Sequence, residues 1–189
     1  MRSKTSAYAI LGMVGIQPMS GYDIRKEIAS SIGYFWHEGY GQIYPTLRRL
    51  AAEGMVAEKR AGGGRHGERT VFAITKKGRA HLKAWLARAP LAQTPRNEML
   101  LKLFLGRLAP GASRTHVESF RAEQKKALAL YSALEKELRK TQSRHPDLPF
   151  WLASVSYGQH LARALLSWSN ETLRMLDGRD GHAGKEGAA

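Results

Sequence analysis

The first 90 residues show a helical period of apolar side chains, interrupted once by a strand-like alternation. Four segments follow the helical period, at residues 5–15, 20–28, 42–53 and 76–88. Between the last two, residues 55–61 and 69–74 alternate polar and apolar side chains, which predicts two short strands. The expected order is therefore three helices, a pair of strands and a fourth helix.

Residues with known preferences at helix ends mark the limits of these segments. Pro18 lacks the N–H that would continue the first helix, so this helix ends before it. Ser20 and Thr75 have side chains that cap helix N-termini, and they stand at the starts of the second and fourth helices. Gly33 and Gly54 mark the ends of the second and third helices, since glycine is the residue most common just after a helix.

The third helix separates an apolar side from a polar side on which the pattern places no carboxylate. The apolar stripe consists of Ile43, Leu47, Leu50 and Ala51, and the opposite face of Gly41, Gln42, Pro45, Arg48 and Arg49, with Tyr44 at its edge. Glycine and proline keep the start of the helix thin, which permits close approach to a partner. Arginine bonds bidentately to guanine and glutamine pairs with adenine, so this face suits the major groove of DNA.

Three short helices followed by a two-stranded wing form a winged helix-turn-helix domain, and the third helix stands where its recognition helix belongs. The glycine-rich stretch 62–68 is expected as a loop too long for a two-residue turn. It carries Arg65 and His66, which suit a minor-groove or phosphate contact. Lys76 and Lys77 open the fourth helix, where their charge opposes the helix dipole. A phosphate contact would explain this placement, and an ordinary solvated charge pair is the alternative.

Beyond residue 90 the pattern predicts helices alone. A linker at 89–95 leads to helices at 96–107, 113–141 and roughly 148–177. The middle helix would be about 42 Å long at 1.5 Å per residue, too long for one neighbour in a small domain to cover, so we expect a partner chain. The mainly α chain then divides into a winged helix-turn-helix domain at 1–90, a helical dimerisation or effector domain at 91–177 and a disordered, glycine-rich tail at 178–189.

Charge narrows the class of partner. The 189 residues include 30 Lys and Arg against 16 Asp and Glu, a net charge of +14. Residues 1–90 carry a net +9 and residues 91–189 a net +5, so the first half is the stronger candidate for contact with a polyanion. Double-stranded DNA is the leading partner and an anionic membrane surface the second. A soluble protein from a basic proteome is the remaining explanation.

The sequence offers little chemistry for catalysis, metals or cofactors. It has no cysteine, its histidines lack metal-ligand spacing, and neither a phosphate-binding loop nor a nucleophile elbow is present. Residues 1–20 begin with basic residues and a short apolar run, as a signal peptide does, but a folded helix follows at once. We expect a cytoplasmic protein that is not an enzyme, needs no cofactor and does not span a membrane.

Several strings carry a resemblance to a known family. They are SGYDI at 20–24, FW at 35–36, GQIYPTLRRL at 41–50, EGMV at 53–56, ITKKGR at 74–79 and NEMLLKLFLG at 97–106. With the last helix they make the chain similar to the PadR-like transcriptional regulators, in the longer subfamily with a helical C-terminal domain of the virulence-activator type. The resemblance implies a homodimer that binds operator DNA through its winged domains and dimerises through its C-terminal helices. Most such regulators repress, a few activate, and some respond to phenolic acids or planar hydrophobic drugs.

The resemblance also implies roles for single residues. Tyr22 and Tyr44 would hold DNA phosphates, while Gln42, Pro45 and Arg48 would face the groove, with Arg49 beside them. The remaining candidates are aromatic: Trp151 and Trp168 pack in the dimer interface or line an effector pocket. The alternative function is a protein-interaction module that keeps the winged-helix scaffold without sequence-specific DNA binding.

Overall fold

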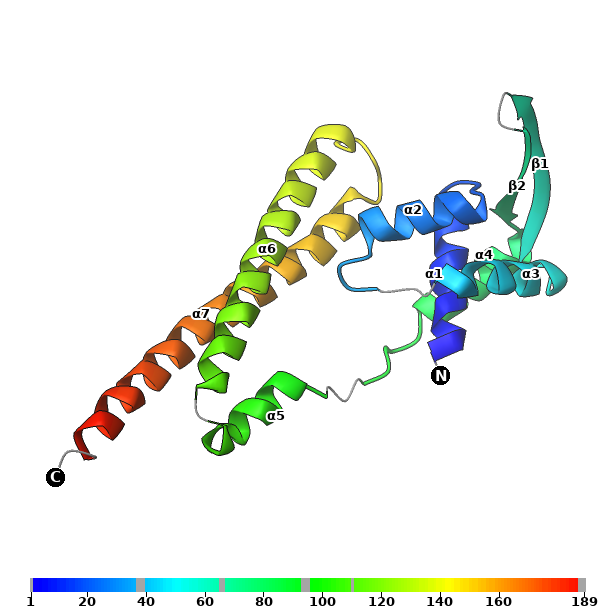
Figure 1. Ribbon diagram of the computed structural model, residues 1–189. Helices are drawn as coiled ribbons and strands as arrows, with labels where there is room; N and C mark the ends of the chain where they lie inside the picture. The colour runs from blue at the N-terminus through cyan, green and yellow to red at the C-terminus, as the bar shows by residue number, and fades with distance from the viewer. Residues whose placement is uncertain (1, 37–39, 65–66, 93–95, 110, 187–189) are drawn as a thin grey trace. The chain divides into compact units, whose positions relative to one another are not determined.

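The chain folds into two compact units, residues 1–93 and residues 94–189. The computed structural model describes residues 2–36, 40–64, 67–92, 96–109 and 111–186 (Figure 1). Among them, no helix combines the length and the apolarity that crossing a membrane requires.

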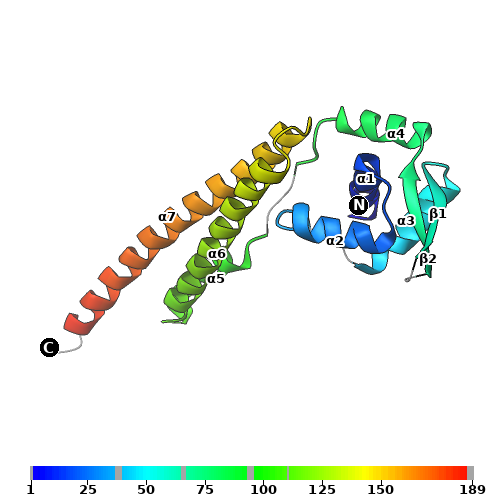
Figure 2. The ribbon, with the colours of Figure 1, turned by 90° about the horizontal axis from the view of Figure 1, so that it is seen from above.

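The first unit has the predicted order of elements. It comprises α1 (Arg2–Ile16), α2 (Gly21–Ser31), a 3-10 turn η1 (Tyr40–Gln42), α3 (Ile43–Ala52), β1 (Val56–Gly64), β2 (Gly67–Ile74) and α4 (Lys76–Leu86). Helix α1 runs through the middle and touches α2, α3, α4 and β2. Figure 2 shows α1 between α2 and α4, with the β1–β2 hairpin beside α3. This is a winged helix-turn-helix domain, as the sequence predicts.

The core of this unit joins one face of each helix to the base of the wing. It consists of Ala7, Ile10, Leu11, Met13, Val14, Met19, Ile24, Ile28, Ile43, Leu47, Leu50, Val56 and Phe72. Leu11 of α1 and Leu47 of α3 are both completely buried. Burying one such side chain contributes about 1.5–3 kcal/mol, so this core fixes which face of α3 remains outside.

The helix ends form where the local signals place them. Ser20 and Asp23 make a reciprocal capping box at the start of α2: the Asp23 N–H donates to Ser20 Oγ (3.2 Å), and the Ser20 N–H donates to Asp23 Oδ2 (3.1 Å). Thr75 Oγ1 accepts the N–H of Gly78 (3.0 Å) at the start of α4. Gly54 follows α3 with a φ of 69°, a conformation that glycine adopts without steric cost.

The wing differs from its prediction. The strands are antiparallel and pair from Val56 opposite Ile74 to Ala61 opposite Arg69, with a further pair of Gly64 and Gly67. Two positions, 65 and 66, separate the strands, so the expectation of a long loop at 62–68 is wrong. An irregularity between Ala61 and Gly64 absorbs the glycines into the strand. Arg65 and His66 lie outside the described residues.

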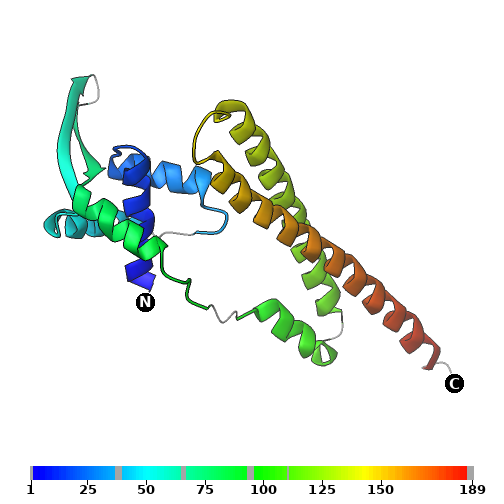
Figure 3. The same ribbon diagram turned by 180° about the vertical axis from the view of Figure 1, so that it is seen from behind.

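The second unit is a helical hairpin preceded by a short helix. It comprises α5 (Glu98–Phe104), η2 (Gly106–Leu108), α6 (Ala112–Thr141) and α7 (Leu148–Glu186). Figure 3 shows α6 and α7 running antiparallel along one another. The single helix predicted at 96–107 is interrupted at Leu105, where the chain turns into η2. Helix α7 continues to Glu186, and the last three residues of the tail predicted at 178–189 lie outside the described residues.

Two contacts set the register of α6 against α7. The ring of Tyr131 lies so close to Gly158 that a Cβ built on this glycine would stand 2.7 Å from the ring. One residue further along α7, the Nε2 of buried Gln159 donates to Glu135 Oε2 (2.8 Å). Gln159 and then Arg139 hold the pKa of the Glu135 carboxyl below its usual range. The hairpin therefore has one defined packing face on each helix.

Candidate nucleic-acid interface

Helix α3 presents its predicted polar face to solvent. Ile43, Leu47 and Leu50 are buried, as predicted, and so is Thr46. The exposed face consists of Gly41, Gln42, Tyr44, Pro45, Arg48 and Arg49. Each of these residues was assigned to the outer face or its edge from the sequence, and none is turned into the core.

The start of α3 is built for close approach. The tight turn η1 leads into Ile43, and Pro45 stands in the first helical turn, where its missing N–H costs no hydrogen bond. Gln42 makes no side-chain capping bond, so its amide remains available to a partner. A Cβ built on Gly41 would meet nothing within 4 Å, so this glycine is not required by contacts within the protein. A helix that begins with few bulky side chains can approach the base edges at the floor of a major groove closely, and an amide side chain at its start can bond to them.

Tyr22 and Tyr44 flank one groove together with Arg48. The groove has a volume of about 510 Å³ and is lined by Ser20, Tyr22, Tyr44, Arg48, Glu58, Arg69, Thr70 and Phe72. Tyr22 is 65% exposed and Tyr44 54% exposed. Three of the residues predicted to contact DNA therefore meet at one place, contributed by α2 and α3, and the wing strands supply part of the lining.

Gly21 explains how Tyr44 reaches that place. A Cβ on Gly21 would stand 2.7 Å from two atoms of the Tyr44 ring. The ring therefore packs directly over the backbone at the start of α2, which only a residue without a side chain allows. This contact connects the SGYDI and GQIYPTL strings physically, although they are separate in the sequence.

Arg49 lies in a different environment from Arg48. Its Nη1 is 3.9 Å from Glu53 Oε1, one helical turn along α3. Both residues line a second cavity of about 270 Å³ with Tyr8 and His81. The expectation that no carboxylate lies near the two arginines is therefore wrong for Arg49, because Glu53, the last residue of the predicted helical segment, lies one helical turn beyond it.

Lys77 has a partner within the domain. Its Nζ donates to the backbone carbonyl of Glu53 at the end of α3 (2.8 Å). The ammonium thus interacts favourably with the negative end of the α3 dipole. This interaction compensates for the unfavourable interaction of Lys77 with the positive end of the α4 dipole. Lys76 is exposed in the same turn.

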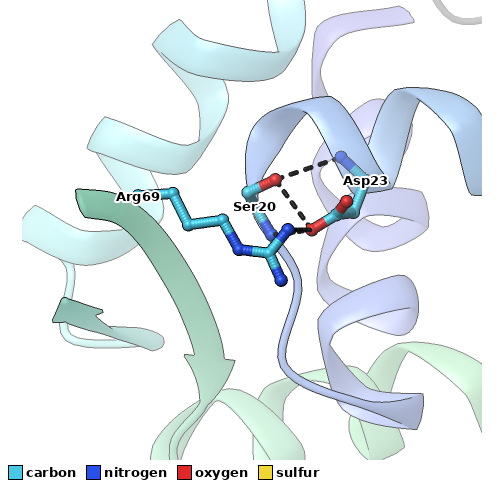
Figure 4. Close-up of polar contacts among 3 residues, drawn as sticks. All are labelled: Ser20, Asp23 and Arg69. Carbon is cyan, nitrogen blue, oxygen red and sulfur yellow. Dashed lines mark hydrogen bonds and ion pairs between the residues drawn. The ribbon is translucent and has the colours of Figure 1, made fainter. Parts of the chain in front are cut away.

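Arg69 is a residue of the groove that sequence reasoning missed. Its Nη1 lies 3.5 Å from Asp23 Oδ2, and Figure 4 shows the side chain reaching from β2 to the capping box. Two hydrogen bonds from Ser20 hold the pKa of the Asp23 carboxyl below its usual range, and Arg69 adds to the effect. The only sequence signal is a cation directly after the glycine-rich stretch 62–68, and the strand register is needed to place it.

The two tryptophans proposed for an effector pocket do not meet within one chain. Trp151 stacks on His145, with ring centroids 4.3 Å apart. Trp168 contacts Phe120 of α6 edge to face, at 5.9 Å. Both lie on α7, roughly 25 Å apart at 1.5 Å per residue. Among the described residues, no group of three His, Cys, Asp or Glu side chains is arranged for a metal ion.

Comparison with known proteins assigns both halves of the chain. The Transcriptional regulator PadR-like family matches residues 10–84, and the Virulence activator alpha C-term family matches residues 95–177. The Negative transcriptional regulator PadR of Bacillus subtilis is 28% identical over 179 residues, covering 90% of this chain and 96% of that protein. A Mycobacterium tuberculosis protein named as a probable transcriptional regulator is 31% identical over 140 residues, covering 68% of this chain and 74% of its own length.

Solved structures agree with this assignment. The crystal structure of Bacillus subtilis PadR in complex with operator DNA superimposes with a TM-score of 0.79 at 26% identity, covering 90% of this chain and 97% of that one. The structure of the same protein with p-coumaric acid gives a TM-score of 0.72, with the same identity and coverage. The recognition-helix strings, the fold and these matches lead to one conclusion: the chain belongs to the PadR-like family of transcriptional regulators, with a C-terminal domain of the virulence-activator type, and it is not an enzyme.

Proposed function

We propose that the protein is a cytoplasmic, ligand-responsive repressor that binds a pseudo-palindromic operator as a homodimer. The observation that carries this proposal is the convergence of Tyr22, Tyr44 and Arg48 on one groove beside the exposed face of α3. The likeness to PadR, which was crystallised on operator DNA, supports the same mode of binding.

In this account α3 enters the major groove of the duplex. Arg48 donates two hydrogen bonds to a guanine, and Gln42 pairs with an adenine, so these two residues read the sequence. Tyr22 and Tyr44 donate their hydroxyls to phosphates on either side and set the register. Arg49 and Lys76 add phosphate contacts at the rim, and Arg65 and His66 of the wing reach the neighbouring minor groove.

Lys77 contributes less directly. Because its ammonium already binds the carbonyl of Glu53, it holds the end of α3 against α4 and contacts a phosphate only through its remaining donors. Pro45 gives no hydrogen bond to DNA and serves by keeping the helix start narrow.

The apolar surface of the second unit supports the homodimer. Four exposed apolar residues of α7 fall within an arc of about 40° at 100° per residue. They are Phe150, Tyr157, Leu161 and Met175. The α7 residues buried in the hairpin, such as Val155 and Leu173, lie well round the helix from this stripe. Helix α5 and η2 expose a further apolar set, namely Leu100, Leu101, Phe104, Leu105 and Leu108. We expect a second copy of the chain to cover both sets, since exposed apolar side chains gathered together mark an interface.

Dimerisation explains regulation by a ligand. Two α3 helices must stand one DNA turn apart, about 34 Å, to meet two half-sites. By analogy with the p-coumaric acid complex of PadR, the effector is a planar aromatic acid or drug. We place Trp151 and Trp168 as candidate pocket walls across the dimer, where a partner's helix supplies the other side. A ligand that alters the dimer crossing, or the hinge near 89–95, changes the spacing of the two α3 helices and lowers the affinity for the operator.

Duplex binding over a salt series tests this function. Each phosphate neutralised contributes about 0.9 to the slope of log affinity against log salt, so six contacts in a dimer give a slope near −5. We expect a steep slope and a preference for one enriched sequence, and we expect a phenolic acid to reduce the affinity. The absence of duplex binding at low salt would instead favour a winged-helix module for protein contacts.

A further inference from the structure

One carboxylate oxygen at the edge of the groove receives three contacts. Asp23 Oδ2 accepts the Ser20 N–H (3.1 Å) and the Ser20 hydroxyl (2.8 Å), and Arg69 Nη1 lies 3.5 Å from it. Figure 4 shows the Ser20 hydroxyl and the Arg69 guanidinium meeting at this atom. The two bonds from Ser20 hold the Asp23 carboxylate at the start of α2 with or without Arg69.

The ion pair between Arg69 and Asp23 is long and exposed to solvent. It is a single contact at 3.5 Å, longer than a charge-assisted hydrogen bond of about 2.7–2.9 Å. The Arg69 side chain is 64% exposed, and ion pairs in such positions contribute about 0–1 kcal/mol. A phosphate accepts the guanidinium fork bidentately and is a better partner. Exchanging Asp23 for a phosphate therefore costs little.

The backbone places Arg69 accurately. β2 pairs with β1 through Ala61 opposite Arg69, and it also exchanges two backbone hydrogen bonds between Phe72 and Met19, the residue before Ser20. These bonds, Met19 N–H to Phe72 O (3.0 Å) and Phe72 N–H to Met19 O (2.8 Å), fix β2 to the segment that leads into α2. The strand that carries Arg69 is thus held against the segment that leads into α2, the helix that carries Tyr22.

Charged side chains of both signs meet at this position. The groove lining contains two guanidiniums, of Arg48 and Arg69, and two tyrosines. Glu58 of β1 also lines it, and Asp23 lies at its edge, so two carboxylates act as the local counter-charges in the free protein. The groove lies beside the face of α3 assigned to the duplex, so the polyanion that reaches it is the DNA backbone.

We propose that Arg69 is a DNA-backbone contact: Asp23 holds it over the groove in the free protein, and on binding it transfers to a phosphodiester of the duplex next to Tyr22 and Tyr44. This inference rests on the proposed function, and it adds a residue of the wing strand to the residues of α2 and α3. Because a phosphate contact carries no sequence information, Arg69 acts on affinity and not on the choice of bases.

The first test compares salt slopes for the full-length protein on one duplex containing the enriched site and on one of unrelated sequence. Arg69→Gln is expected to weaken both complexes on the order of tenfold and to reduce the slope by about 0.9 per protomer, leaving their affinity ratio unchanged. Lys83→Gln removes one exposed cation from α4, outside the groove lining, and serves as the matched control with an unchanged slope. An Arg69→Gln slope equal to that of Lys83→Gln would overturn the proposal.

A second variant distinguishes a direct contact of Arg69 with phosphate from a role in which Arg69 only positions the wing through its ion pair with Asp23. Asp23→Asn removes the charge and keeps an oxygen that can accept from Ser20, so the capping box persists. If Arg69 binds phosphate, Asp23→Asn binds duplex at least as tightly as the natural protein, because the competing carboxylate is gone. If Arg69 matters only through Asp23, both variants weaken binding equally and the double variant is no weaker, which would refute the proposal.

Failure of the proposed function gives a different result. In that case the natural protein itself binds neither duplex in the salt series, and Arg69 loses its assigned role with it. If the natural protein binds with a steep slope while Arg69→Gln behaves like the control, the function stands and this inference alone is wrong. Thermal unfolding of each variant confirms that the exposed substitution leaves the fold intact.

Discussion

The ring of Tyr44 lies against the backbone of Gly21, so close that a Cβ on the glycine would be 2.7 Å from the ring. This one contact connects the recognition helix to the start of α2 and sets the hydroxyl of Tyr44 at the rim of the groove. Since the ring is more than half exposed, it can swing away without disturbing the core.

Gly21→Ala is therefore expected to affect DNA binding far more than stability. The new methyl group displaces the Tyr44 ring, and operator affinity should fall as it does in Tyr44→Ala, on the order of tenfold. The free energy of unfolding should change by less than about 1 kcal/mol, because no core side chain moves. Titration of a labelled duplex measures the affinity, and urea unfolding measures the stability.

Gly12→Ala is the matched control, because a Cβ at this position in α1 meets nothing within 4 Å. It should leave operator affinity unchanged and raise stability by about 0.5–1 kcal/mol through helix propensity. Full operator affinity in Gly21→Ala would mean that the position of Tyr44 is unimportant for binding.

Gly78→Ala should instead destabilise the first unit. A Cβ on buried Gly78 would clash with the backbone carbonyl of Met55, which already accepts hydrogen bonds from Thr75. Because a backbone group cannot move aside as a ring can, we expect a loss of about 1–3 kcal/mol. The urea midpoint measures it, and a midpoint equal to that of Gly12→Ala would contradict the packing described at the start of α4.

Local signals explain what could be predicted from the sequence. The caps formed by Ser20 and Thr75 and the turn at Gly54 depend on neighbours within about four positions, so residue type alone indicated them. The apolar stripe of α3 has a period of 3.6, and its burial against Leu11 follows from that period. The exposed face of α3 was predictable for the same reason.

Contacts that depend on register could not be predicted. Arg69 reaches Asp23 only because β2 pairs with β1 in one particular register and with the segment before α2. Because glycine is rare inside strands, the glycines at 62–64 predict a loop, yet an irregularity in β1 accommodates them. Arg48 and Arg49 have different surroundings because Arg49 lies near Glu53 and beside Tyr8 of α1 and His81 of α4. These neighbours lie outside α3 itself.

The ionisation of Asp23 gives a prediction in pH. Its pKa is lowered in the folded state, chiefly by the hydrogen bonds from Ser20, so the ionised carboxylate stabilises the fold above the unfolded value of about 3.9. That contribution is lost as the pH falls through the lower folded pKa. The stability advantage of the natural protein over Asp23→Asn should be present at neutral pH and vanish in strong acid.

Unfolding free energies of the two proteins across this pH range measure the difference, and other carboxylates cancel in it. Arg69→Gln should keep most of the pH dependence, because Ser20 is the larger cause of the lowered pKa. A difference between the natural protein and Asp23→Asn that stays constant with pH would show that Asp23 ionises alike in both states.

Arg48→Ala should weaken binding to the preferred operator by about 1–3 kcal/mol and relax the choice of base at one position of each half-site. Dimerisation should be unaffected, since Arg48 is exposed on α3 and the proposed interface lies in the second unit. Sedimentation of the variant checks the dimer, and competition with single-base operator variants checks the specificity. Loss of the dimer would show that this face of α3 has another role.

The central claim is that the exposed face of α3 lies in the major groove of a specific duplex. Selection of bound duplexes from a random pool, performed in parallel with the natural protein and with Arg48→Ala, tests it most directly. The account predicts a pseudo-palindrome with half-sites about one helical turn apart, and degeneracy at a single guanine position per half-site for the variant. Recovery of no enriched sequence, or of the same sequence with equal stringency from both proteins, would contradict it.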